Sequence, residues 1–346
     1  MPTLAAVRPA PDSASQAMAK AASFVTVDDG SAGQRLDNFL ATHLKGVPKS
    51  HVYRIVRSGE VRVNKGRVDA AYRLQLDDVV RVPPVKTAEK TSNPSIEAAS
   101  RAFSAGKAGN TRGLALDVLF EDDALLAINK PAGMAVHGGS GISFGVIEGL
   151  RAIRPEAKFL ELVHRIDRET SGILLIAKKR SALTAMHAML RGETVQAIEK
   201  RYYALVKGNW PDERRHIRTK LAKYVTAAGE RRVSVDDDDG QESHTIVTRV
   251  EKLPGATLLD CEIKTGRTHQ IRVHLGSMGF PLIGDDKYGD FALNKHVAAV
   301  KHGGLKRMFL HARLMAFAHP LTAEKMTIEA PLSVDLEKYL AYLRRI

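Results

Sequence analysis

The sequence predicts an α+β protein with two folded units, a small one over residues 24–86 and a large one over residues 113–346. Two stretches that are poor in large apolar side chains, residues 1–23 and 87–112, precede and separate these units. Their composition is typical of a disordered tail and of a linker. Within each unit, segments with helical spacing of apolar residues lie beside short segments with the pattern of strands, and this mixture indicates the α+β class.

The small unit begins with two predicted helices. In residues 34–44, apolar side chains recur at intervals of three and four, as on one face of a helix. Residues 50–61 repeat this pattern, with Ser50 as a candidate N-cap. The stretch VRVNKGRV, residues 61–68, then predicts a strand with a tight turn, and residues 74–82 predict a further strand.

Basic side chains outnumber acidic ones along the whole chain. The sequence has 52 Lys and Arg against 39 Asp and Glu, which gives a net charge of +13. Such a surplus favours a polyanionic partner such as nucleic acid, although a basic enzyme without one is the alternative. Between Lys45 and Arg67, seven basic residues accompany a single acid, Glu60, and predict either a phosphate-contacting surface or a solvated charged face. The seven are Lys45, Lys49, Arg54, Arg57, Arg62, Lys65 and Arg67.

The cysteine content and the N-terminal sequence exclude several classes of protein. Cys261 is the only cysteine, so a disulfide framework and a cysteine-ligated zinc cannot form within one chain. His269 and His274 are five residues apart, which places them on different sides of a helix or a strand, and we expect no metal site there. No signal peptide and no run of membrane-spanning length is present, so we expect a cytoplasmic protein that does not contact membranes.

In the large unit, the stretch HRIDRETSGILLIAKK, residues 164–179, places Asp167 between two arginines. The run ILLIA predicts a strand that is buried on both faces, and TSG predicts the turn before it. A carboxylate at such a strand end can be partly desolvated, face a cleft and act as a nucleophile if a cation keeps it ionised. By residue type alone, a structural ion pair is the commoner interpretation.

A second segment, residues 258–279, reads as a strand, a turn at Thr265–Thr268 and a helix. Ile271, Leu275 and Met278 would share one face of that helix. An arginine in the turn, Arg267, would lie beside the first amides of the helix, and such a place attracts anions. The anion could be the Asp167 carboxylate or an RNA phosphate.

A third segment, KRYYALVKG at residues 200–208, alternates with a period of two and predicts a strand. Tyr202 and Tyr203 would therefore take opposite faces. One tyrosine should be buried, and the other can face a cleft, where it could stack on a base and offer a hydroxyl. A tyrosine in the core or in an interface is the alternative.

Together these three segments resemble the RluA family of pseudouridine synthases. The family signature H-R-(L/I)-D-x-x-T-S-G matches residues 164–172, K-x-Y-x-A-x-V-x-G matches residues 200–208, and T-G-R-x-H-Q-I-R-x-H matches residues 265–274. A K-P-x-G element matches residues 130–133. The resemblance covers most of the large unit. It implies the pseudouridine synthase fold, in which helices and loops flank a central mixed, largely antiparallel sheet with an RNA-binding active-site cleft.

The small unit resembles the S4 RNA-binding module, through RLDNFL and SHVYRIVRSGEVRVNKGRV. With PLIGDDKYGD at residues 281–290, this order is similar to a branch of the family that modifies large-subunit ribosomal RNA. The resemblance implies a monomeric enzyme that isomerises specific uridines of 23S ribosomal RNA, free or in a pre-ribosomal particle, without a metal, a cofactor or DNA. A sister branch that acts on other uridines, and a non-catalytic RNA-binding assembly factor, are the alternatives.

The resemblance also implies roles for individual residues. Asp167 would be the nucleophile or its equivalent, Arg267 would pair with it, and Tyr202 would stack on the target base and take part in proton transfer. The target base must leave the stack, and Arg165 would fill the vacated space by the resemblance, although residue type alone leaves contact with a phosphate equally open. The further residues expected to bind the substrate RNA are His164, Thr170, Ser171, Gly172, His269, Gln270 and Arg272, and residues 170–172 would also shape the turn that exposes the carboxylate.

Overall fold

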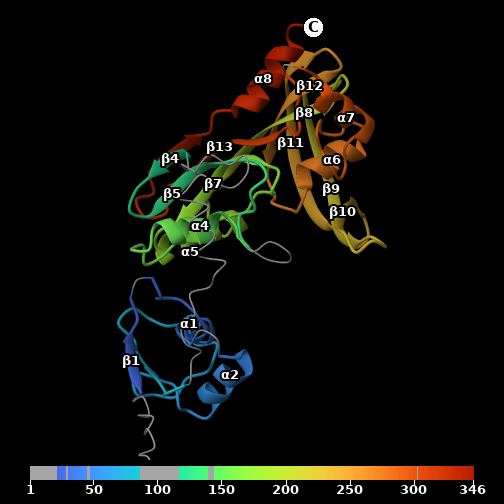
Figure 1. Cartoon of the computed structure of the whole chain (residues 1–346). Helices are drawn as coiled ribbons and strands as arrows, with labels where there is room; N and C mark the ends of the chain where they lie inside the picture. The colour runs from blue at the N-terminus through green and yellow to red at the C-terminus, as the bar shows by residue number, and fades with distance from the viewer. Residues whose placement is uncertain (1–21, 29, 45–46, 86–116, 139–143, 302) are drawn as a thin grey trace, which may run out of the picture. The chain divides into compact units, whose positions relative to one another are not determined.

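The computed structural model shows two separate bodies (Figure 1). The chain divides into two compact units, within residues 1–91 and 92–346, and the division falls inside the predicted linker. The linker, the predicted tail up to residue 21, and Lys45 lie outside the described residues. The structure describes residues 22–28, 30–44, 47–85, 117–138, 144–301 and 303–346.

The small unit packs two helices against one face of an antiparallel sheet. Among its described residues the sheet has three strands, in the order β1-β3-β2. Apolar side chains from both helices, with Val63 and Val80 from the strands, form one core. Its elements are β1 (Ser23–Thr26), α1 (Leu36–His43), α2 (Lys49–Arg57), β2 (Arg62–Val63) and β3 (Val79–Val82).

Two details of the small unit differ from the predictions. Helix α2 begins after Pro48, whose carbonyl accepts its first amide hydrogen bonds. Ser50 therefore lies inside the first turn, and its prediction as N-cap is wrong. The strand predicted over residues 74–82 begins only at Val79, because Asp77 has a left-handed φ of 65° that interrupts extended backbone.

The large unit is built on a single mixed sheet. Its described residues contribute eleven strands, in the order β10-β9-β11-β12-β8-β13-β7-β5-β4, with β14 beside β13 and β6 beside β7. Strands β13 and β7 are parallel and the other pairs are antiparallel, which confirms the predicted sheet. The strands are β4 (Asp117–Glu121), β5 (Leu125–Lys130), β6 (Glu161–Leu162), β7 (Ser171–Ala177), β8 (Glu199–Lys207), β9 (Arg214–Val225), β10 (Arg231–Val235), β11 (Gln241–Leu253), β12 (Ala256–Ile263), β13 (Leu310–Ala318) and β14 (Lys325–Glu329).

Helices cover both faces of this sheet. Helices α4 and α6 pack on the face that carries Leu174, Tyr202 and Cys261, which we call the front face. Helices α5, α7 and α8 pack on the opposite face, against Leu175 and Leu205 among others. No helix among the described residues is long and apolar enough to cross a membrane. The helices are α4 (Val146–Ile153), α5 (Arg180–Arg191), α6 (Gln270–Ser277), α7 (Phe291–Ala299) and α8 (Val334–Leu343).

Strand β7 holds the turn that carries Asp167. All of its residues are buried, as predicted for ILLIA. Its second residue, Gly172, has a φ of 106°, and a Cβ at this position would lie 2.2 Å from the carbonyl oxygen of Ala312 in β13. Only glycine therefore allows β7 and β13 to approach each other where the turn ends.

Candidate active site

Asp167 lies in the turn between β6 and β7, and the lysine of the K-P-x-G element, Lys130, is hydrogen-bonded to this turn. The amide of Thr170 donates a hydrogen bond to the Asp167 carbonyl at 3.1 Å. The Lys130 ammonium group is fully buried and donates to the Arg168 carbonyl at 3.0 Å and to two carbonyls of its own turn. Burial lowers the pKa of Lys130 to about 7. The three carbonyl acceptors use all three protons of the ammonium form.

His164 and Ser171 hold the two ends of the same turn. The Nε2 atom of His164 accepts a hydrogen bond from the Leu175 amide at 3.1 Å, and burial lowers the pKa of this ring to about 4, so that the ring is neutral. Ser171 is 1% exposed, and its Oγ lies 2.8 Å from Nδ1 of the buried His311. These positions support a role for His164, Ser171 and Gly172 in shaping the turn rather than in contacting RNA.

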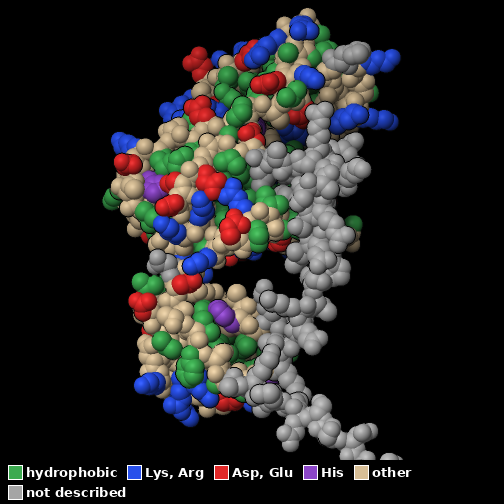
Figure 2. Space-filling model, turned by 60° about the vertical axis from the view of Figure 1, so that its left-hand side comes forward, with side chains coloured by type: hydrophobic (Ala, Val, Ile, Leu, Met, Phe, Trp, Pro, Cys, Tyr) green, Lys and Arg blue, Asp and Glu red, His purple; other side chains and the backbone are tan. Residues whose placement is uncertain are grey.

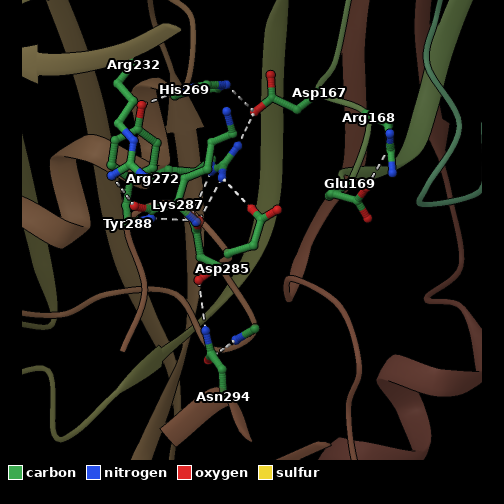
Figure 3. Close-up of polar contacts among 12 residues, drawn as sticks. Asp167, Arg168, Glu169, Arg232, His269, Arg272, Asp285, Lys287, Tyr288 and Asn294 are labelled. Atoms are coloured by element: carbon green, nitrogen blue, oxygen red, sulfur yellow. Dashed lines mark hydrogen bonds and ion pairs between the residues drawn. The ribbon is translucent and has the colours of Figure 1, made fainter. Parts of the chain in front are cut away.

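The charged partner of Asp167 is Arg272, in the first turn of α6 (Figure 3). Its Nη1 donates to Asp167 Oδ2 at 3.3 Å. The predicted partner, Arg267, instead donates from Nε to the carbonyl of Glu242 at 3.0 Å. The predicted pairing of Asp167 with Arg267 is therefore wrong. Arg267 precedes the helix and turns toward β11, whereas Arg272 projects from the helix toward the carboxylate.

Arg272 is shared with a second carboxylate, that of Asp285. Its Nε and Nη2 donate to the two oxygens of Asp285 at 2.7 Å each, and both side chains are buried. Burial alone would lower the pKa of Arg272, but the hydrogen bonds and the charge of Asp285 outweigh it, and Asp167 adds to them, so that the pKa is raised. The bidentate pair fixes the guanidinium plane and leaves Nη1 for Asp167.

His269, at the start of α6, approaches the same Asp167 oxygen as Arg272 (Figure 3). Its Nδ1 lies 2.8 Å from the Tyr288 hydroxyl, which itself accepts a hydrogen bond from the Val233 amide. In the tautomer whose Nδ1 accepts the Tyr288 hydroxyl proton, the ring proton is on Nε2, the nitrogen 3.9 Å from Asp167 Oδ2. Burial lowers the pKa of His269. The negative charge of Asp167 raises it, but by less than burial lowers it.

A pocket of about 80 Å³ opens beside the Asp167 carboxylate, and Tyr202 lines it with Ile263 and Leu310. As the alternation predicts, Tyr202 lies on the front face of β8 and Tyr203 on the opposite face. Burial raises the pKa of Tyr202, and the charge of Asp167 raises it further, so the hydroxyl keeps its proton at neutral pH.

A wider groove of about 500 Å³ meets this pocket at Asp167. Basic side chains prevail in its lining, and they include Arg165, which is exposed and lines both hollows. Arg168 pairs with Glu169 at 3.0 Å and points away from the Asp167 carboxylate (Figure 3). Of the two arginines that flank Asp167 in the sequence, neither is therefore its ionic partner, and Arg165 is left facing the groove.

The remaining predicted residues lie close to the site with different exposures. Thr170 is buried and lines the pocket. Arg267 also lines the pocket, but it is exposed. Gln270 is buried, and its side chain bonds the Arg267 amide and Thr245, so it fixes the turn before α6. The sequence interpretation missed three residues, Lys130, Asp285 and Tyr288. All three stand in quoted motifs, K-P-x-G and GDDKYGD, but neither motif indicated contact with the Asp167 turn.

Comparison with known proteins agrees with this geometry. The profile described as RNA pseudouridylate synthase matches residues 124–277, and the S4 domain profile matches residues 34–80. Two proteins called "Ribosomal large subunit pseudouridine synthase C" are 52% identical (Haemophilus ducreyi) and 50% identical (Escherichia coli K12) to the chain. They cover 93% and 92% of this chain, which covers 95% of each. The chain therefore belongs to the RNA pseudouridylate synthase family, and it is an RNA pseudouridine synthase with an S4 domain.

The names of these relatives confirm the predicted resemblance to the branch that acts on the ribosomal large subunit.

Solved structures agree on the fold. Human RNA Pseudouridylate Synthase Domain Containing 4 gives a TM-score of 0.54 at 20% identity, over 72% of this chain and 97% of that one. Human RNA Pseudouridylate Synthase Domain Containing 1 gives 0.51 at 22% identity, over 67% of this chain and 95% of that one.

Proposed function

We propose that the protein converts specific uridines of 23S ribosomal RNA into pseudouridine, in free RNA or in a pre-ribosomal particle. The observation that carries this proposal is the Asp167 carboxylate, which Arg272 orients at the junction of a pocket lined by Tyr202 and a basic groove. The names of the relatives at about half identity support the large-subunit RNA as substrate.

The reaction breaks the N1–C1′ bond of uridine, turns the uracil and forms a C5–C1′ bond. C5 loses its proton and N1 gains one, so atoms and electrons balance without an oxidant or a group carrier. Asp167 supplies the carboxylate that acts on the nucleotide. Arg272 holds that carboxylate in place, and Tyr202 stacks on the base and takes part in proton transfer at carbon.

The target nucleotide has to leave its stack before it can reach Asp167, at a cost of roughly a few kcal/mol. Arg165 is exposed at the junction of the pocket and the groove, so its planar cationic head is placed to occupy the space that the base vacates. The groove then receives the flanking nucleotides, whose phosphates its basic side chains attract. Arg267, at the rim of the pocket, belongs to this RNA-facing set.

Replacement of Tyr202 by phenylalanine separates its two roles. Tyr202→Phe keeps the ring and loses the hydroxyl, so we expect substrate affinity to be retained and kcat to fall by roughly 10²-fold or more. Tyr202→Ala should also raise KM, because the stacking ring is lost. Steady-state kinetics on a large-subunit transcript measures kcat and KM. Wild-type kcat in Tyr202→Phe would exclude the hydroxyl from proton transfer.

The S4 domain presents a second RNA-binding surface. Lys and Arg side chains gather at one end of the small body (Figure 2), and Lys49, Arg54 and Arg57 are exposed on α2. The further predicted members of this surface are Arg62, Lys65 and Arg67, at the turn after α2.

Neutralisation of the exposed charges on α2 tests that surface. We expect the triple variant Lys49→Ala, Arg54→Ala and Arg57→Ala to bind RNA more weakly. The slope of log K against log salt should become less steep by up to about 2 to 3, because each lost phosphate contact changes that slope by about 0.7–0.9. The rate at saturating RNA should stay the same, because these residues are absent from the pocket and groove linings. An unchanged salt slope would contradict the assignment.

The function itself is tested by mapping pseudouridines in ribosomal RNA from a strain that lacks the gene and from its parent. Carbodiimide labelling with primer extension should show sites in 23S RNA that disappear in the deletion strain. Wild-type protein should restore them, and the Asp167→Asn variant should not. A non-catalytic assembly factor would leave every site modified.

We propose domain boundaries at residues 24–86 and 113–346, with a tail before the first domain and a linker between the two. We also propose that the enzyme acts as a monomer. Ribosomal RNA as substrate supports action in the cytoplasm on RNA and not on DNA.

A further inference from the structure

The sheet of the S4 domain has one face that the helices do not cover. Across the three strands, Phe24 of β1 pairs with Arg81 of β3, which pairs with Arg62 of β2. Their neighbours Val80 and Val63 point to the other face and enter the helix-packed core. The alternation of strands therefore sets an aromatic ring and two guanidinium groups side by side on the uncovered face.

This face is hollowed and positively charged. The ring of Phe24 is 67% exposed. A hollow of about 1020 Å³ lies over it, and four cations contribute to its lining: Arg62, Lys65, Arg67 and Arg81. The one acid among the described lining residues is Glu60. Its carboxylate is engaged by the Ser58 hydroxyl at 2.7 Å and by Arg54 at 3.6 Å.

The arginines of this hollow are held in place without being neutralised. Arg62 donates to the carbonyls of Gly59 and Lys65 at 3.3 Å each, and Arg81 donates to the carbonyl of Glu60 at 2.5 Å. Among the described residues, neither arginine has an ion pair with a carboxylate. Bonds to carbonyls orient a guanidinium group but leave its full charge for an anion that arrives from solvent.

An exposed ring beside fixed cations matches the chemistry of an unpaired nucleotide. The base presents a π-face that stacks on an aromatic side chain, and the adjoining phosphates pair with Arg and Lys. A base inside a duplex cannot offer that face, because its neighbours cover it. The four cations also favour a polyanion over an apolar segment of protein.

We propose that this face, which we call the sheet platform (Phe24, Arg62, Lys65, Arg67 and Arg81), binds an unpaired nucleotide of the substrate RNA. The base stacks on Phe24, and the basic side chains hold its phosphates. Phe24, Arg62 and Arg81 lie on the side of the sheet away from α1 and α2, whereas Arg67 adjoins the charges of α2, because it also lines a second hollow with Arg57. This inference rests on the proposed function only in taking ribosomal RNA as the substrate.

The test compares Phe24→Ala and Phe24→Tyr in the full-length protein, with Leu76→Ala as the matched control. Leu76 is an exposed apolar residue of the same domain, 52% exposed, and does not line the hollow. Fluorescence anisotropy measures affinity for a short single-stranded RNA and for a duplex of the same sequence. Thermal unfolding confirms that each variant is folded.

We expect Phe24→Ala to bind the single strand roughly 5- to 100-fold more weakly, because one base–aromatic stack is lost. Phe24→Tyr should restore the affinity, Leu76→Ala should behave as wild type, and duplex binding should change little. On a large-subunit transcript, KM should rise in Phe24→Ala at constant kcat.

Unchanged single-strand affinity in Phe24→Ala would overturn the platform, and so would an equal loss in Leu76→Ala. An equal loss in Leu76→Ala would indicate that exposed apolar side chains of this domain contribute to RNA binding wherever they lie. These outcomes are independent of the proposed function. Failure of the wild-type enzyme to modify 23S RNA would overturn that function, while the binding comparison would still decide the platform.

Discussion

Asp167→Asn abolishes pseudouridine formation while RNA binding is retained. This is the largest effect that the structure predicts, and we expect a loss of about 10³-fold or more, the scale on which removal of a catalytic nucleophile acts. Asparagine keeps the shape of the side chain and its place in the turn. It cannot carry the negative charge that Arg272 orients at the mouth of the pocket.

The fold should survive this change. Arg272 keeps its two hydrogen bonds to Asp285, and the carbonyl of residue 167 still accepts the Thr170 amide. Thermal unfolding and RNA affinity therefore serve as controls in the same experiment. Rapid conversion of a large-subunit transcript by purified Asp167→Asn would remove Asp167 from the reaction.

Loss of Arg272 is expected to have the second largest effect, on stability and activity together. In Arg272→Met, the buried Asp285 keeps its charge without its cation, and breaking a buried pair in this way costs about 3–5 kcal/mol of folding free energy. Asp167 also loses the guanidinium group that donates to it, so we expect kcat to fall by roughly 10²-fold or more. Urea unfolding and single-turnover rates measure the two effects.

Two companion variants separate stability from catalysis. Arg272→Met combined with Asp285→Asn removes both charges, so it should recover much of the stability but not the rate. Arg272→Lys keeps a charge but lacks the planar fork that holds Asp285 while it reaches Asp167, so it should fold and remain slow. A wild-type rate in either variant would show that orientation of Asp167 by Arg272 is dispensable.

Arg267→Ala should affect KM more than kcat.

The sequence predicted much of the site because the reactive residues stand in motifs. Asp167, Tyr202 and the turn before α6 meet at one pocket, as the order of the three segments implied. The pairing was assigned to the wrong arginine because two arginines of one motif, Arg267 and Arg272, lie on either side of the start of a helix. Which of them reaches the carboxylate depends on the position of the first helical turn.

Other parts of the site could not be read from sequence. Asp285 acts through Arg272, and its side chain gives no local sign of that partner. Lys130 reaches the Asp167 turn across β5 and β7, a contact that only the sheet order creates. Similarly, Phe24 looks like an ordinary strand residue until the register places it beside Arg81. Each of these is a contact between segments that are distant in the chain.

The close approach of β7 and β13 affects how tolerance to substitution should be interpreted in this enzyme. Gly172 touches no reacting atom in the proposed mechanism, yet any side chain there would collide with the backbone of Ala312. A saturation-mutagenesis screen would therefore rank Gly172 with Asp167 as intolerant. The cause would be spacing between two strands, so intolerance in the T-S-G motif alone does not identify a reactive group.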